Sequence, residues 1–290
     1  MRSTAATTMA EDITIAVLSG KGGTGKTMVS VNLAAVAGNA TYIDCDVEEP
    51  NGHLFLKPAM LSQEIITIGK PEVDNRLCDG CKICSDACAF KALAVVKKKL
   101  LIFPEICHSC GLCYTLCPQG ALTEVQQSLG VLYTGHHEDL RVLAAEMNIG
   151  EPSGVPLIKA LMSHMSGGLT IIDGPPGSGC LVHETIEHAD FCLLVAEPTR
   201  FGEQNLALVH RLVTLMGKPA AVLLNKTTGD PNPSEAYAKA NGLPIIASLP
   251  WDDELARVTS RGALITEEHG AYRQYFSTLL ATILKEAHRA

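Results

Sequence analysis

The stretch that most constrains the fold of this 290-residue chain is ITIAVLSGKGGTGKTMVSVNLAAVA, residues 13–37. A β-branched apolar segment leads into a glycine-rich loop, and apolar residues at helical spacing follow it. The pattern therefore predicts a strand, a tight loop and a helix. Gly20, Gly25, Lys26 and Thr27 fit the phosphate-loop pattern G-x4-G-K-[ST].

This loop is expected to bind a nucleotide together with Mg²⁺. Glycines let backbone N–H groups turn inward around phosphate oxygens, and the start of the helix adds partial positive charge. Lys26 should contact the β- and γ-phosphates, and the Thr27 hydroxyl should ligate Mg²⁺. The residues expected around the nucleotide are Gly20, Lys21, Gly22, Gly23, Thr24, Gly25, Lys26, Thr27 and Met28.

Composition narrows the fold and function classes. The chain is 47% hydrophobic but only 4% aromatic, as is usual for parallel α/β layers. A net charge of -8 argues against a general nucleic-acid binder. No apolar run approaches the roughly 18 residues of a membrane span. The N-terminal MRSTAATTMAEDI has no hydrophobic segment, so we expect no secretory signal and a cytoplasmic location.

Cysteines are the second strong signal, because eight of the 11 lie between Cys78 and Cys117. They form two sets, and each member of the second set lies 29 residues after its counterpart in the first. Four equal offsets indicate an internal duplication. The sets are Cys78, Cys81, Cys84 and Cys88, then Cys107, Cys110, Cys113 and Cys117.

Each set reads C-x2-C-x2-C-x3-C, the pattern of bacterial ferredoxins with two [4Fe–4S] clusters. The fourth cysteine of each set is expected to reach the other cluster. The predicted ligands are Cys78, Cys81, Cys84 and Cys117 for one cluster, and Cys88, Cys107, Cys110 and Cys113 for the other. Zinc is the alternative, but its ligands usually come as separated pairs. Disulfides are disfavoured without an export signal. Pro118 follows the second set as in ferredoxins, whereas Ala89 follows the first.

The cysteine array is expected to form a small α+β domain inserted at residues 73–127. The nucleotide-binding domain would then comprise residues 1–72 and 128–290, and we expect it to be a doubly wound, mostly parallel α/β sheet. The stretch KPEVDN, residues 70–75, is interpreted as a polar entry linker. The segments ALAVV and LLIF flank Lys97–Lys99, which predicts a hairpin with an exposed tip.

Lys21 gives the loop a second lysine, so that it reads K-G-G-x-G-K-T. This resembles the deviant Walker A class of P-loop ATPases, which includes MinD, ParA, Mrp and the nitrogenase iron protein. From Ile13 onward the chain resembles MinD-like ATPases that carry an inserted two-cluster ferredoxin domain. The resemblance implies slow, Mg²⁺-dependent ATP hydrolysis and an ATP-dependent homodimer or heterodimer with a related ATPase.

The resemblance also implies roles for individual residues. Lys21 would reach across the dimer to the partner's nucleotide. Asp46 would orient the attacking water, although carboxylates after a strand also merely cap helices. Asp173 would hold the Mg²⁺ shell. Asn225 would recognise the base, and Pro250 and the residues up to Asp253 would lie near the adenine.

The remaining features have plainer interpretations. Cys45 and Cys192 are expected in the core, and Cys180 is expected to be a buried or half-buried structural thiol. The C-terminal stretch AYRQYFSTLLATILKEAHRA has apolar residues at helical spacing and is not notably basic. It is expected to be a core-packed helix rather than a membrane anchor.

Three functional classes fit these observations. The first is an ATP-gated electron carrier that acts on an unidentified redox or metalloprotein partner, and we rank it first. The second is an ATPase that assembles or carries iron–sulfur or metal cofactors. The third is a positioning ATPase of the MinD type in which the clusters sense redox state.

Overall fold

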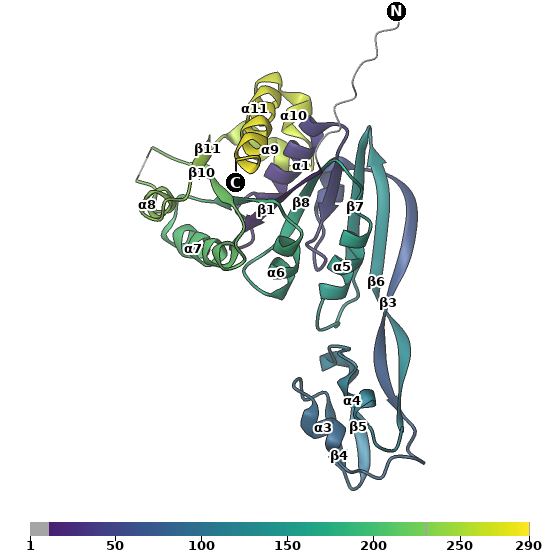
Figure 1. Cartoon of the computed structure of the whole chain (residues 1–290). Helices are drawn as coiled ribbons and strands as arrows, with labels where there is room; N and C mark the ends of the chain where they lie inside the picture. Colours follow the sequence, from purple (N-terminus) through teal and green to yellow (C-terminus); the bar gives the residue numbers. More distant parts are fainter. Residues whose placement is uncertain (1–11, 230, 290) are drawn as a thin grey trace, which may run out of the picture.

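The computed structural model describes residues 12–229 and 231–289 (Figure 1). Most of the N-terminal stretch MRSTAATTMAEDI lies outside these residues. A nine-stranded sheet runs through the described chain in the order β11-β10-β9-β1-β8-β2-β7-β6-β3. Its strands are β1 (Ile13–Ser19), β2 (Thr41–Asp44), β3 (Ala59–Val73), β6 (Leu122–His137), β7 (Leu140–Met147), β8 (Leu169–Pro176), β9 (Phe191–Ala196), β10 (Ala220–Thr227) and β11 (Ile245–Pro250).

The sheet is mostly parallel, as the sequence predicts. All neighbours from β11 to β7 pair in parallel, whereas β7/β6 and β6/β3 are antiparallel. Parallel register aligns strand ends, and here it pairs Asp44, the last residue of β2, with Asp173 of β8. Asp44 and the predicted Mg²⁺ residue Asp173 are thereby brought to the same edge of the sheet as the loop that follows β1.

Helices cover both faces of this sheet. On one face α1, α9, α10 and α11 pack over a core that includes Val29, Tyr42 and Phe276. On the other face α5, α6 and α7 pack over two further apolar clusters. The helices are α1 (Lys26–Ala37), α2 (Gly52–Leu56), α5 (Val155–Ser163), α6 (Cys180–Glu187), α7 (Arg200–Leu215), α8 (Pro233–Ala240), α9 (Asp253–Ser260), α10 (Ile265–Glu268) and α11 (Gly270–Ala287).

The C-terminal helix agrees with the prediction, because α11 buries Phe276, Leu279, Leu280 and Ile283 against the sheet. No described helix is both long and apolar enough to cross a membrane.

The cysteine-bearing segment forms a small unit at the far end of the long β3/β6 ribbon (Figure 1). The predicted hairpin is confirmed: β4 and β5 pair antiparallel around Lys97 and Lys98. The expected boundary at Val73 is the last residue of β3, whereas Gln127 lies inside β6. The elements of the small unit are α3 (Ile83–Ala87), β4 (Leu93–Val96), β5 (Lys99–Ile102), a 3-10 turn (Pro104–Ile106) and α4 (Leu112–Thr115).

The interpretation of residues 70–75 as a linker is wrong for the first four of these residues. Lys70, Pro71, Glu72 and Val73 belong to β3 and pair with β6. Proline is tolerated there because β3 is the edge strand of the sheet. The ribbon therefore enters the small unit as continuous strand, without a flexible joint at Lys70.

The large core offers a simple test of the packing. Leu161 in α5 is fully buried, whereas Leu215 in α7 is 75% exposed. We expect Leu161→Ala to lower the free energy of unfolding by about 2–5 kcal/mol because it leaves a cavity. Leu215→Ala should change it by no more than about 0.5 kcal/mol. Urea unfolding of both variants checks this, and equal losses would contradict the described core.

Candidate functional site

The glycine-rich loop connects β1 to the start of α1 and bends tightly at Gly25. Gly25 has a φ of 91°, and a Cβ there would lie 2.3 Å from Nδ2 of Asn225. A glycine is therefore required by both the backbone and the close approach. Asn225 also donates from Nδ2 to the Thr24 carbonyl at 2.7 Å, and Lys226 donates from Nζ to the Gly23 carbonyl at 2.6 Å. Lys226, which the sequence analysis did not single out, thus helps to hold the loop.

Lys26 begins α1 and makes a buried ion pair with Asp173. Its Nζ lies 2.6 Å from Oδ1 of Asp173, and Tyr42 donates its hydroxyl to Oδ2 at 3.2 Å. Burial is the largest single influence and lowers the pKa of Lys26, but the charge and hydrogen bond of Asp173, together with the charges of Asp44 and Asp46, outweigh it, and the pKa is raised. Lys26 also lies 3.5 Å from the Thr27 hydroxyl. The structure therefore brings together the predicted phosphate and Mg²⁺ residues.

Asp44, the last residue of β2, and Asp46 lie close to this ion pair. Asp44 is fully buried and accepts backbone N–H bonds from Asp46 at 3.1 Å and from Gly52 at 2.8 Å. Burial, followed by the charge of Asp173, raises the pKa of Asp44 to about 7. Asp46 is half-buried and lines the cavity in front of the loop. Burial is also the main reason that its pKa is raised to about 6.

Lys21 contacts residues of its own chain. Its Nζ lies 2.5 Å from Oε1 of Glu197 and 5.6 Å from the centre of the Phe201 ring, at the start of α7. An ion pair and a cation–π contact both stabilise the ammonium in this position. Glu197 and Phe201 were not identified from sequence, because their contacts join segments far apart in the chain.

A cavity of about 610 Å³ lies in front of the loop, within the range of small-molecule sites. Of the predicted segment, the residues from Lys21 to Met28 line it, as do Asp46, Asn225 and Pro250, whereas Gly20 does not. Trp251, Phe55 and Leu255 add apolar surface to its lining. The cavity thus combines the backbone of the phosphate loop, which suits an anion, with apolar side chains that suit a nucleobase.

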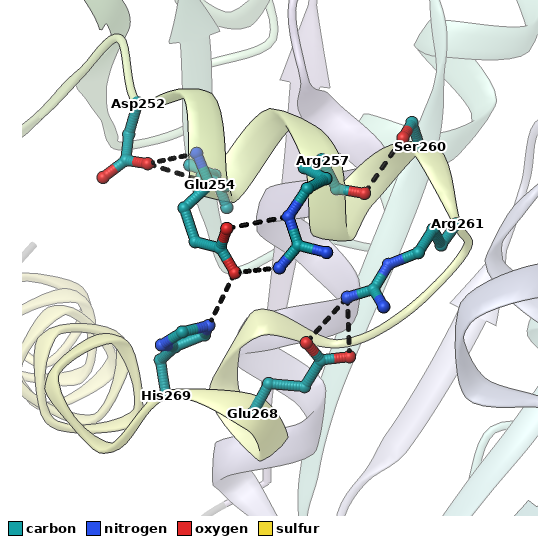
Figure 2. A network of polar contacts seen from close by, with 8 residues as sticks. Asp252, Glu254, Arg257, Ser260, Arg261, Glu268 and His269 are labelled. Carbon is teal, nitrogen blue, oxygen red and sulfur yellow. Dashed lines mark hydrogen bonds and ion pairs between the residues drawn. The ribbon is translucent and has the colours of Figure 1, made fainter.

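Helix α9 forms a wall of this cavity and is held by a network of charged side chains (Figure 2). Asp252 caps α9 by accepting N–H bonds from Glu254 and Leu255 at 2.7 and 3.0 Å. Glu254 accepts from Arg257 and lies 3.0 Å from Nε2 of His269. Since Arg257 already neutralises Glu254, this network fixes the wall rather than forming a cation site.

The eight clustered cysteines line two separate hollows in the small unit. Each hollow is surrounded by one predicted ligand set, which combines three cysteines of one repeat with the fourth of the other. The first hollow is lined by Cys78, Cys81, Cys84 and Cys117, and the second hollow by Cys88, Cys107, Cys110 and Cys113. Cys84 also lines the second hollow, as do Phe90 and His108, whose rings are stacked with their centres 3.9 Å apart. The fourth cysteine of each repeat accepts an equivalent N–H bond, from Ala92 to Cys88 Sγ and from Ala121 to Cys117 Sγ, both at 3.3 Å.

The duplication extends to the backbone. Three residues of the first repeat have positive φ, and so does the residue 29 positions after each. The pairs are Gly80 and Ser109, Lys82 and Gly111, and Lys91 and Gly120. Both repeats therefore fold into the same tight loop, which explains why the sequence spacing is retained.

The wide spacing of the sulfur atoms tests the zinc alternative. Zinc–sulfur bonds of about 2.3 Å place the ligands of a tetrahedral site about 3.8 Å apart. Among the described residues, one group of three His, Cys, Asp or Glu side chains has ligand atoms that all lie within 4.8 Å of one another, namely Glu254, Glu268 and His269. This group contains no cysteine. All eleven cysteines are also free of disulfides. The hollows therefore fit a larger group with one thiolate at each corner better than a single zinc ion.

The other cysteines divide into two kinds. Cys45 and Cys192 are fully buried, as predicted. The prediction for Cys180 is wrong, because this residue is exposed. It is the first residue of α6 and follows an open glycine-rich turn, so little packs over it.

Comparisons with known proteins agree with this architecture. Residues 15–265 match the family model described as the CobQ/CobB/MinD/ParA nucleotide binding domain. Uncharacterized protein MJ0578 of Methanocaldococcus jannaschii is 32% identical over 88% of this chain and 90% of its own length. Uncharacterized protein MJ0579 of the same organism is 27% identical over 75% of this chain and 81% of its own.

A solved structure shows the same fold. The septum site-determining protein MinD of Pyrococcus horikoshii, complexed with Mg-ADP, superposes with a TM-score of 0.58 and 18% identity. The match covers 92% of this chain and 94% of that one.

The raised pKa of Asp44 predicts a pH-dependent stability of the nucleotide-free protein. The folded chain retains a proton that the unfolded chain, with an Asp pKa of 3.8, releases between about pH 4 and pH 7. The free energy of unfolding should therefore fall as pH rises through this window. Asp44→Asn should flatten that dependence, whereas the exposed Asp139→Asn should not. Urea unfolding at pH 5 and pH 7.5 checks this, and an unchanged slope in Asp44→Asn would contradict it.

Proposed function

The chain belongs to the CobQ/CobB/MinD/ParA nucleotide-binding family, and we propose that it is an Mg²⁺-dependent ATPase whose nucleotide switch acts on two [4Fe–4S] clusters. The observation that carries the cluster half of this proposal is the lining of the two hollows, each by one of the predicted sets of four cysteines. Members of the family are P-loop ATPases, which supports the ATPase half.

The nucleotide half works by positioning and electrostatics. The backbone N–H groups from Gly22 to Gly25 would surround the phosphates, and Lys26 would neutralise charge on the β- and γ-phosphates. Thr27 and Asp173 would hold the Mg²⁺ shell, so Lys26 must exchange its present contact with Asp173 for one with phosphate. Asp46 would orient the attacking water. Its raised pKa fits a carboxyl that is partly withdrawn from solvent.

Trp251 and Pro250, which line the cavity, would pack against the adenine. Asn225 lines the same cavity, but its amide is bonded to the Thr24 carbonyl and its Oδ1 accepts from the Lys226 N–H. A role in recognising the base therefore requires Asn225 to contact the base while it holds the loop.

The small unit would hold the clusters through its cysteines. Four buried residues form its core, namely Cys84, Leu93, Leu100 and Leu122, and so small a core rarely sustains a folded unit without a metal or disulfides. When bound, [4Fe–4S] clusters supply one-electron transfer at potentials set by charge and hydrogen bonds around the sulfurs. Cys81 and Cys110 are exposed, so each hollow has an edge that a redox partner can approach.

The partner of this ATPase would be a protein that exchanges electrons with the exposed cysteine edges. Dimerisation with a second copy or with a related chain would bring Lys21 to the neighbouring nucleotide. That two relatives occur in one organism is consistent with pairing between related chains.

Iron content tests the cluster assignment. Wild-type protein purified without oxygen should contain about eight irons per chain. Cys81→Ala should lower this to between about four and seven, because one cluster loses a ligand. Cys180→Ala removes another exposed thiol and should leave the iron unchanged. Colorimetric iron and sulfide analysis checks this, and equal iron in all three proteins would remove Cys81 from the ligand set.

Lys21 should reach the partner's nucleotide only when it leaves Glu197. Lys21→Ala is expected to abolish dimerisation in Mg-ATP, since the partner's nucleotide loses its second lysine. Glu197→Gln weakens the contact that holds Lys21 in its own chain and should preserve the dimer. Light scattering with and without Mg-ATP measures both, with Lys159→Ala as an exposed-lysine control. A Lys21→Ala protein that still dimerises would remove the assigned role.

A further inference from the structure

Lys70 is a buried lysine at the junction between the large sheet and the small unit. It lies near the end of β3, and only 2% of its surface is exposed. A lysine is rarely so buried unless its charge is compensated. The neighbours of its ammonium group therefore indicate what the residue does.

The Lys70 ammonium joins two parts of the chain. Its Nζ donates to the Pro104 carbonyl at 3.0 Å and to the Cys107 carbonyl at 2.9 Å, and Cys107 lines the second hollow. Its third neighbour is Oε2 of Glu151, 3.1 Å away, in the turn that follows β7. In the described chain this oxygen is buried and accepts no hydrogen bond, so the ammonium is what compensates its charge.

The turn that carries Glu151, residues 148–154, also touches the nucleotide-binding part. At its start, Met147 donates its N–H to the Val47 carbonyl at 2.9 Å, and Val47 directly follows Asp46. At its end, a Cβ on Gly154 would lie 2.4 Å from Val47 and 3.5 Å from Leu181 of α6. The turn is therefore packed against two segments of the nucleotide-binding part, one that follows Asp46 and one that follows Asp173.

We propose that the Lys70–Glu151 pair is the link through which nucleotide binding changes the environment of the second hollow. The proposal rests on the function proposed above and names the residues that couple its two halves. A shift of Asp46 and Val47 on nucleotide binding moves the turn, and Glu151 moves with it. The field of the Lys70 ammonium at Cys107 then changes, because the carboxylate that offsets it has moved.

The link acts on one hollow and not on the other. Lys70 donates to the carbonyl of Cys107, which belongs to the second set of cysteines. The residues that line the first hollow do not include Lys70, Pro104 or Cys107. Positive charge near a cluster favours the reduced form, which is more negative. The two clusters should therefore have different potentials, and ATP should shift mainly the one held by Cys107.

Substitutions at the pair should move one potential in opposite directions. Lys70→Met removes the positive charge and should make the potential of the cluster held by Cys107 more negative. Glu151→Gln leaves the ammonium without its counter-charge and should make the same potential more positive. Both should abolish the shift that Mg-ATP causes in the wild type. The exposed Lys99→Met and Glu105→Gln are matched controls in the small unit, and both should keep that shift.

The measurement is an anaerobic potentiometric titration followed by electron paramagnetic resonance, with and without Mg-ATP. The double variant Lys70→Met/Glu151→Gln leaves no unpaired buried charge, so it remains informative if a single variant folds poorly. It should also lack the ATP shift. An ATP shift of wild-type size in Glu151→Gln or in the double variant would overturn the proposal, as would a wild type whose two potentials both ignore Mg-ATP.

Hydrogen exchange gives a readout that does not depend on redox activity. In the wild type, Mg-ATP should change the exchange of amides in residues 148–154 and in residues 104–110. In Glu151→Gln only the first group should respond. If both groups respond equally in that variant, Glu151 is not the link. This outcome is distinct from a failure of the proposed function, which an iron content well below eight per chain would reveal.

Discussion

The buried contact between Lys26 and Asp173 is the interaction on which the site depends. It forms because parallel register places the ends of β1, β2 and β8 at one edge of the sheet. Lys26 is 6% exposed and Asp173 is fully buried, so neither charge has water to compensate it. In this state the Lys26 ammonium is paired with the Asp173 carboxylate, although a bound phosphate would need the same ammonium. Nucleotide binding must therefore rearrange the edge of the sheet, and any rearrangement there reaches Asp46 and the segment after it.

The inserted unit depends on the sheet through the β3/β6 ribbon. Its own apolar core is small, and its loops require positive φ at lysine and serine positions where glycine would be less strained. Side-chain contacts must offset the strain of such loops. The cysteine sets can provide such contacts within the small unit, and the Lys70 ammonium provides them from the side of the large sheet. The unit is thus held in a defined position at the junction, which coupling to the nucleotide site requires.

Much of this architecture is readable in the sequence because its signals are local. The phosphate loop, the Lys97–Lys98 hairpin and the repeated cysteine spacing each lie within a short window. Lys70 was missed because the pattern KPEVDN has a proline and charges, which usually mark a linker. Glu197 and Glu151 were missed for another reason. Their partners, Lys21 and Lys70, are far away in the chain, and no periodicity reports such contacts. The exposed position of Cys180 likewise depends on what packs over α6.

The central claim is that the nucleotide site and the cysteine sites are energetically coupled. Coupling is reciprocal, so a change of cluster potential by ATP requires an equal change of ATP affinity on reduction. The most direct measurement is the dissociation constant of Mg-ATP for the fully oxidised and fully reduced wild-type protein, by anaerobic calorimetry. We predict that the two constants differ by severalfold. Equal constants, in protein that contains its full complement of iron, would contradict the account.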